Sequence, residues 1–114
     1  MYTFKAKVIS GQGRGRRIGF PTINLDKLDL DLDYGVYLAK ILFKGRIYKG
    51  LLHFGPKKTF GEGISVEVYI KDFNLDIYGK SVKIITGRRI RSIKKFGSPE
   101  ELTEQIKKDL LAII

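Results

Sequence analysis

The sequence contains no cysteine and no tryptophan, and it has one histidine. Without cysteine the protein can form neither disulfide bonds nor thiolate zinc sites, and it has no cysteine nucleophile. One histidine is too few for a histidine-based metal site or a histidine-based catalytic relay. Because cysteine is absent, its usage gives no information about the redox compartment in which the protein works.

The sequence also lacks a long apolar segment. No run approaches the roughly 20 residues that a membrane-spanning helix needs, and residues 1–5 lack a secretory apolar core. We therefore expect a cytoplasmic protein without membrane contact. Its 114 residues, 43% hydrophobic and 30% charged, predict one folded domain that covers residues 1–114.

Acidic residues are in the minority. Lys and Arg number 22 against 12 Asp and Glu, which gives a net charge of +10 at pH 7. Such a charge attracts nucleic acid, anionic membranes and nucleotide triphosphates, and it does not choose among them. Several basic residues lie in the glycine-rich stretch 11–17, where backbone amides and guanidinium groups can bind phosphate together.

Apolar residues alternate with a period of two, which predicts an all-β domain. Strands are expected at residues 2–9, 35–43, 46–54, 64–70 and 81–90, with a tight turn at Lys44 and Gly45. Residues 64–70 predict a half-buried strand, because its even-numbered positions are Ile or Val and its odd-numbered positions are Ser65, Glu67 and Tyr69. Glu67 should therefore point away from the core.

Two segments between these strands are harder to assign. The glycine-rich stretch and the residues that follow it, up to Leu25, are expected to form a long ordered loop of the kind that tends to be functional. Residues 25–33 alternate Leu with Asp, which fits either an edge strand or an extended connection.

The last element is predicted to be a helix. Ser98 is a suitable N-cap, Pro99 suits the first helical position, and Glu101 completes a capping box. An apolar stripe follows at spacings of three or four residues, formed by Leu102, Ile106, Leu110 and Ile113. Such a stripe should cover one side or one end of a barrel.

The common nucleotide-binding motifs are missing. The sequence has no GxxxxGK[ST] loop, and the glycine-rich stretch lacks the strand-turn-helix setting of a dinucleotide site. Thr22 and Asn24, however, are two residues apart, so on an extended chain they project to the same side. Two neutral oxygens so placed, together with nucleotide phosphates and water, suit Mg²⁺.

The segment from Gly15 to Leu25 resembles the riboflavin kinase signature, in which a glycine loop precedes an FPTxN run. Further matches follow in the same order along nearly the whole chain. They are Gly35-Val36-Tyr37, residues 55–60, Val66-Glu67-Val68-Tyr69-Ile70, Asp72-Phe73, Tyr78-Gly79-Lys80, Arg91, Phe96 and the C-terminal helix.

The resemblance implies a six-stranded antiparallel barrel with a C-terminal α-helix. The implied reaction is Mg²⁺-dependent transfer of the γ-phosphate of ATP to the 5′-hydroxyl of riboflavin, which yields FMN and ADP. It also implies that Thr22 and Asn24 hold the metal and that Glu67, in the VExxI motif, is the general base. Nucleotide or phosphate contacts are predicted for Gly11, Gly13, Gly15, Arg16, Gly19, Phe20, Pro21 and Thr22, and flavin contacts for Arg91 and Phe96.

Two departures from the family pattern bear on flavin binding and turnover. Ile93 stands two residues after Arg91, where the family commonly has glutamate, and residues 53–60 replace the usual NIGxRPTF. Asp72 and Asp76 are alternatives to Glu67 as the carboxylate near substrate, and His53 is expected to be a barrel or rim residue. We expect no FAD synthesis, because no adenylyltransferase domain is recognisable.

Two alternative functions stay open from the residues alone. One is a small basic barrel that binds RNA or single-stranded DNA through exposed aromatic and basic side chains. The other is a flavin-binding barrel without catalytic turnover. The co-occurrence of FPTIN and VEVYI favours the kinase, so we expect a monomer that binds riboflavin and ATP and does not bind nucleic acid.

Overall fold

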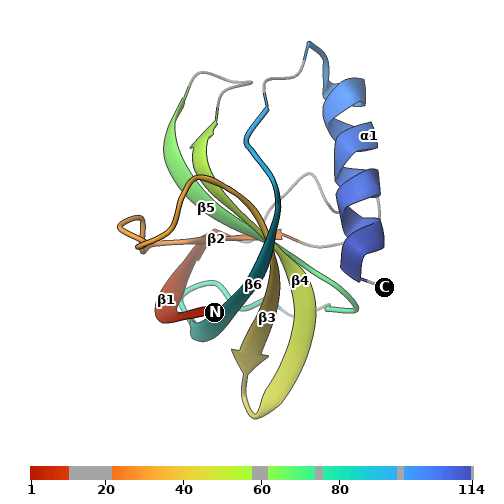
Figure 1. Ribbon diagram of the computed structural model, residues 1–114. Helices are drawn as coiled ribbons and strands as arrows, with labels where there is room; N and C mark the ends of the chain where they lie inside the picture. The colour runs from red at the N-terminus through yellow and green to blue at the C-terminus, as the bar shows by residue number, and fades with distance from the viewer. Residues whose placement is uncertain (11–21, 58–61, 74–75, 95–96, 114) are drawn as a thin grey trace.

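Six antiparallel strands close into a barrel, and one helix lies against its outer wall in the computed structural model (Figure 1). The structure describes residues 1–10, 22–57, 62–73, 76–94 and 97–113. The strands are β1 (Tyr2–Ser10), β2 (Thr22–Leu25), β3 (Gly35–Phe43), β4 (Arg46–Lys57), β5 (Glu62–Ile70) and β6 (Ser81–Arg91). Helix α1 (Pro99–Leu110) continues into the short 3-10 helix η2 (Leu111–Ile113). The predicted all-β barrel with a C-terminal helix is confirmed.

The order of strands around the barrel is β1-β2-β5-β4-β3-β6, and β6 pairs with β1 to close it. The predicted β3–β4 hairpin is confirmed, and its register runs without a shift from Phe43 opposite Arg46 to Gly35 opposite Phe54. Lys44 and Gly45 take positive φ values of 48° and 76°, as a tight turn between twisted strands requires.

The prediction of a loop that continues to Leu25 is wrong for its last four residues, which form strand β2. Residues Thr22 to Leu25 pair with β5 on one side and with β1 on the other. This short strand closes the barrel between two longer strands, and its backbone groups are satisfied by both neighbours. The pairing of β2 depends on β5, which is far away in sequence. The local pattern of glycine and proline residues therefore did not predict this strand.

Beyond Leu25 the chain forms a connection rather than a strand, which decides between the two predictions for residues 25–33. The connection is fastened to the barrel at both ends. The Asp26 carboxylate accepts a hydrogen bond of 2.9 Å from the backbone N–H of Lys7, and the Tyr37 hydroxyl donates one of 2.6 Å to the Asp33 carbonyl. Burial raises the pKa of the Tyr37 phenol above its ordinary value, so the hydroxyl keeps the proton that it donates.

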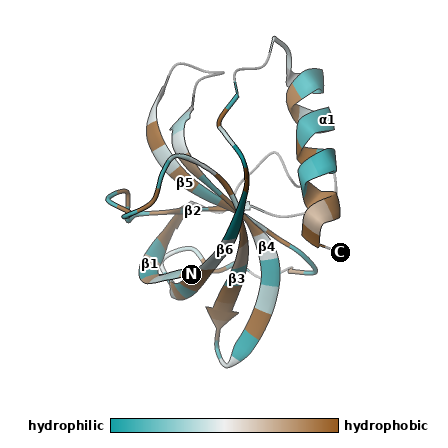
Figure 2. Ribbon diagram, viewed as in Figure 1, coloured by the Kyte–Doolittle hydropathy of each residue, from teal (hydrophilic) through white to brown (hydrophobic). Residues whose placement is uncertain are grey.

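The barrel interior is filled by apolar side chains from all six strands. Along β5 these are Val66, Val68 and Ile70, as the alternation predicts, whereas Ile64, which the same alternation put on the core face, is exposed near the start of the strand. Ile41, Leu52 and Ile84 complete the centre with no exposed surface on any of the three. Apolar and polar bands alternate along β4 and α1 in the hydropathy view (Figure 2). The driving force for closure is therefore burial of one face of each strand.

Helix α1 begins where the sequence predicts. The Ser98 hydroxyl accepts a hydrogen bond of 3.2 Å from the Glu101 N–H, and the Glu101 carboxylate accepts one of 2.7 Å from the N–H of Gly97. The predicted apolar stripe of Leu102, Ile106, Leu110 and Ile113 is buried on the outer wall of the barrel. Within the described ranges, no helix is long and apolar enough to cross a membrane.

Candidate functional site

Three polar side chains form a row across three neighbouring strands. Asn24 on β2 lies opposite Glu67 on β5, and Glu67 lies opposite His53 on β4. Residues directly opposite one another in antiparallel strands share a face, with Cβ atoms about 4.5–5.5 Å apart. This row lies on the outer wall of the barrel, because the residues that flank Glu67, Val66 and Val68, fill the interior.

Thr22 lies on the same face, two residues before Asn24 and opposite Tyr69. Its side chain has no exposed surface, and its Oγ1 atom has no hydrogen-bond partner. A buried hydroxyl without a partner is unfavourable, and in native proteins such an atom has a specific cause, such as local strain, a catalytic role or a bound water or ion. Thr22 Oγ1 therefore identifies a position that a bound ion or a ligand oxygen would satisfy.

Glu67 points away from the barrel interior, as predicted, but the prediction of a half-buried strand is wrong over residues 66–70. Glu67 is only 7% exposed and its neighbour Tyr69 only 6%. The reason is tertiary, since Tyr69 packs together with Leu51 and with the stripe of α1. Tyr69 is thus covered on the outer side of β5, and Glu67, two residues earlier, is also almost fully buried rather than on an open surface.

A second hydroxyl lies beside Glu67. Ser65, two residues earlier on β5, has a buried Oγ atom that also lacks a hydrogen-bond partner. The residue opposite it is Gly55 on β4, which brings no side chain to the pair. Gly55 has a φ of +145°, and a Cβ there would come within 3.2 Å of Tyr34 and within 3.1 Å of Ile93. The alternation of residues 64–70 predicts Ser65 on this face, but no motif in the sequence assigns it a function.

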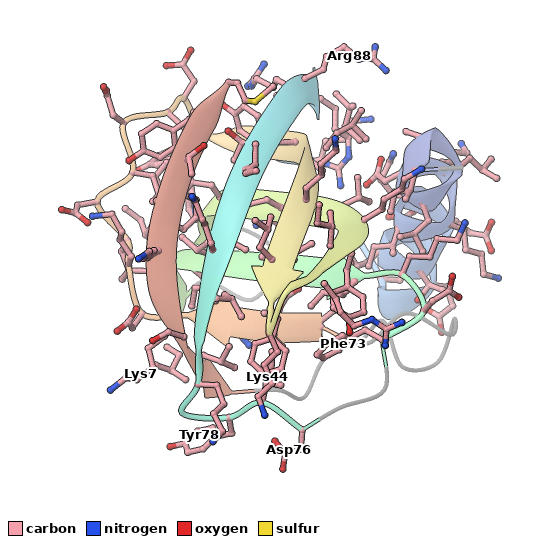
Figure 3. All side chains as sticks on the ribbon, turned by 90° about the horizontal axis from the view of Figure 1, so that it is seen from below. Lys7, Lys44, Phe73, Asp76, Tyr78 and Arg88 are labelled. Carbon is pink, nitrogen blue, oxygen red and sulfur yellow. The ribbon has the colours of Figure 1, made fainter. Side chains whose placement is uncertain are left out.

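The alternative carboxylates lie elsewhere. Asp72 and Asp76 are both exposed and follow the end of β5, beyond the residues that pair with β2. Figure 3 shows Asp76 at the margin of the barrel near Tyr78, pointing outward. Neither residue shares the row of Asn24 and Glu67, so the geometry favours Glu67 over both.

Arg91, which the resemblance connects with flavin, makes a structural contact. Its Nε donates to both carboxylate oxygens of Asp109 at 3.0 Å, and its Nη2 donates to Oδ2 at 2.8 Å. The side chains of Arg91 and Asp109 are only 13% and 8% exposed, so the pair holds α1 against β6. The predicted flavin contact of Arg91 stays a prediction.

Asp109 was not identified from the sequence, although a signal was present. It stands seven residues after Leu102 and three after Ile106, which places it on the apolar stripe of the helix. A carboxylate on such a stripe is almost never fully buried unless it is paired. Gln105, one turn earlier, donates a further hydrogen bond of 2.9 Å to Asp109 Oδ1.

Part of the predicted site lies outside the described residues. This applies to Gly11, Gly13, Gly15, Arg16, Gly19, Phe20, Pro21 and Phe96. Two surface depressions formed by described residues, of about 680 and 340 Å³, lie away from the Asn24–Glu67 row. The larger borders Asp72 and Phe73, and the smaller lies between β3, β6 and η2. The candidate site therefore rests on strand register and on the unpartnered hydroxyls.

The model of the riboflavin kinase (flavokinase) family matches residues 1–113. This chain belongs to the riboflavin kinase family. The departures at residues 53–60 and at Ile93 thus occur within a member of the family. Asn24, from the FPTxN motif, lies directly opposite Glu67, from the VExxI motif, on the adjacent strand.

Relatives in Bacillus subtilis are longer than this chain. A bifunctional riboflavin kinase/FMN adenylyltransferase is 45% identical over 114 residues, which cover 95% of this chain and 36% of that protein. The RNA-binding riboflavin kinase RibR is 35% identical over 108 residues, which cover 93% of this chain and 47% of that protein. The chain therefore spans between about a third and a half of the length of these two riboflavin kinase relatives.

A solved structure agrees with the barrel fold. The crystal structure of riboflavin kinase from Trypanosoma brucei superimposes with a TM-score of 0.61 at 26% identity. The match covers 97% of this chain and 76% of that one. Six strands and the C-terminal helix are thus the riboflavin kinase fold.

Proposed function

We propose that the chain is a riboflavin kinase that transfers the γ-phosphate of ATP to the 5′-hydroxyl of riboflavin. The products are FMN and ADP. The observation that carries the proposal is the placement of Glu67 directly opposite Asn24, with the unpartnered Thr22 Oγ1 on the same face. Family membership supports it, because the two motifs that contribute these residues are those of riboflavin kinases.

The side chains on β2 fit a magnesium ion. Thr22 offers a buried hydroxyl oxygen that lacks a partner, and Asn24 offers an amide oxygen two residues along the strand. Mg²⁺ prefers hard oxygen ligands and keeps few protein contacts when substrate phosphates and water complete its shell. When bound, the ion would neutralise charge on the phosphate oxygens, which is a large part of phosphoryl-transfer catalysis.

Glu67 is suited to be the general base. As the 5′-hydroxyl oxygen of riboflavin forms a bond to the γ-phosphorus and the bond from that phosphorus to the bridging oxygen breaks, the hydroxyl proton passes to the Glu67 carboxylate. ADP leaves with the bridging oxygen. The carboxylate is opposite Asn24, so the attacking oxygen and the phosphate would meet over the outer face of β5 and β2.

Phosphate binding by residues 11–21 belongs to the same proposal. The predicted contacts of Gly11, Gly13, Gly15, Arg16, Gly19, Phe20 and Pro21 precede Thr22 directly in sequence. Backbone amides and an arginine in such a segment suit the triphosphate of ATP. The flavin contacts of Arg91 and Phe96, the cytoplasmic location and the monomeric state are also proposals.

The alternative of RNA or single-stranded DNA binding is less favoured, because the kinase family accounts for residues 1–113. One relative is an RNA-binding riboflavin kinase, so the same assay series should include a labelled single-stranded oligonucleotide. Nucleic-acid binding in place of kinase activity would show as a salt-sensitive affinity without FMN formation and without a Mg²⁺ requirement.

The decisive experiment incubates the chain with riboflavin, ATP and Mg²⁺ and follows FMN by chromatography. We expect FMN to accumulate with Mg²⁺ and to be absent when the ion is chelated. A protein that binds riboflavin but makes no FMN under these conditions would be the flavin-binding barrel without turnover, and the kinase proposal would be abandoned.

A further inference from the structure

Two side-chain oxygens in the described part of the chain are buried without a hydrogen-bond partner. Both lie on the outer face of β2 and β5 that carries Asn24 and Glu67, which we call the site face. They are Thr22 Oγ1 and Ser65 Oγ. Thr22 is accounted for by the proposed metal site. Ser65 is not, although its unpartnered hydroxyl is the same kind of observation.

The strand register places these two hydroxyls on opposite sides of Glu67. Thr22 lies opposite Tyr69, two residues after Glu67 on β5, whereas Ser65 lies two residues before Glu67. Two residues of antiparallel strand correspond to roughly 6.8 Å, and alternate residues point to the same face. Along the direction of β5, Glu67 therefore lies between the level of Thr22, a proposed metal ligand, and the hydroxyl of Ser65.

The surroundings of Ser65 supply no partner for its hydroxyl. Gly55, directly opposite on β4, has no side chain. Beyond it lie Tyr34 and Ile93, close enough that a Cβ at position 55 would contact both. A serine hydroxyl can donate one hydrogen bond and accept two, so Ser65 is equipped for a ligand that presents hydroxyl groups.

We propose that Ser65 Oγ hydrogen-bonds a hydroxyl group of the ribityl chain of riboflavin and so helps to select a flavin that carries a polyol. The inference rests on the proposed function. If the phosphate donor lies toward Thr22, near the Tyr69 side of Glu67, the acceptor approaches from the Ser65 side. While its terminal hydroxyl contacts Glu67, an earlier hydroxyl of the same chain lies toward Ser65.

The test is the variant Ser65→Ala, with Ser81→Ala as the matched control at an exposed position at the start of β6. Binding is measured by quenching of flavin fluorescence for riboflavin and for lumiflavin, which has the same ring system with a methyl group in place of the ribityl chain. We expect Ser65→Ala to raise the Kd for riboflavin by about 2- to 12-fold, the usual effect of one lost hydrogen bond. The Kd for lumiflavin and the KM for ATP should be unchanged.

A melting curve separates this role from a structural one. Removal of an unpartnered hydroxyl should leave the Tm unchanged or slightly higher. An unchanged riboflavin Kd, an equal loss of affinity for both flavins, or a lowered Tm that accounts for the loss would each overturn the inference. If the wild-type chain binds riboflavin but makes no FMN, the proposed function fails while the two Kd values still decide the role of Ser65.

Discussion

Two regions on the outside of the barrel come from strands with similar alternating sequences, but their outward-facing side chains have different environments. On the site face, Glu67 is 7% exposed and Thr22 is fully buried. On the face formed by β1, β6, β3 and β4, Lys5 lies opposite Lys83 and Lys40 opposite Lys49, and all four are exposed. Figure 3 shows Lys7, from the same side of β1, extending outward.

The difference comes from what covers each face. Helix α1 packs over Leu51 and Tyr69 and leaves the lysine pairs in water. Water and salt screen the repulsion between the lysines, so their pairing costs little. A buried carboxylate is harder to accommodate than an exposed lysine, so Glu67 is not a solvated residue of the kind that the lysine pairs represent.

The largest expected effect is at the centre of the site face. Glu67→Gln should lower kcat for FMN formation by roughly two to four orders of magnitude, because the amide cannot accept the hydroxyl proton. Affinity for ATP should change little. Lys83→Gln, on the lysine face, is the control and should retain wild-type kcat. A loss smaller than tenfold in Glu67→Gln would remove Glu67 from the role of base.

The next effect concerns the attachment of helix α1, which packs over Leu51 and Tyr69. Asp109→Ala removes the carboxylate that pairs with the largely buried guanidinium of Arg91, and loss of one member of such a pair should lower the free energy of unfolding by about 3 kcal/mol. Glu104→Ala is the control. Its carboxylate forms an ion pair with Lys107 at 3.6 Å, but both side chains are exposed, so this pair should contribute little to stability. Urea titration measures both, and an equal, small effect would show that the Arg91 pair does not hold α1.

A smaller effect is expected at the metal position. Asn24→Ala should raise the Mg²⁺ concentration needed for half-maximal activity by roughly tenfold, in the range seen when a group that supports a metal site is lost. Asp29→Ala, at an exposed position of the connection after β2, should leave the titration unchanged. A magnesium titration identical to that of the wild type would argue against metal contact by Asn24.

The smallest effect is expected on the lysine face. Lys83→Glu replaces a pair of like charges with a pair of opposite charges across β1 and β6, which should stabilise the fold by about 0.2–1 kcal/mol. The gain should be larger at low salt and the kcat unchanged. Denaturation at two salt concentrations measures it, and a salt-independent or negative change would show that the repulsion between Lys5 and Lys83 is not felt.

Local pattern was enough to predict much of the fold. The alternation in residues 64–70 predicted which side of β5 faces the interior, the dipeptide Lys44-Gly45 predicted the hairpin, and Ser98 predicted the start of α1. Each of these features depends on neighbours within a few residues. Motifs in the sequence also predicted the candidate site residues. Thr22 and Asn24 were predicted as metal ligands and Glu67 as the general base.

The sequence by itself therefore determined five of the six strands, the helix and the direction in which Glu67 points, because those follow from short-range periodicity and capping. Only the tertiary structure decided that Thr22 to Leu25 form a strand and that Asn24 lies opposite Glu67. It also decided that Arg91 binds Asp109 and that Ser65 Oγ is left without a partner. These contacts join residues far apart in the chain, and their register and burial arise only when the barrel closes and α1 packs on its wall.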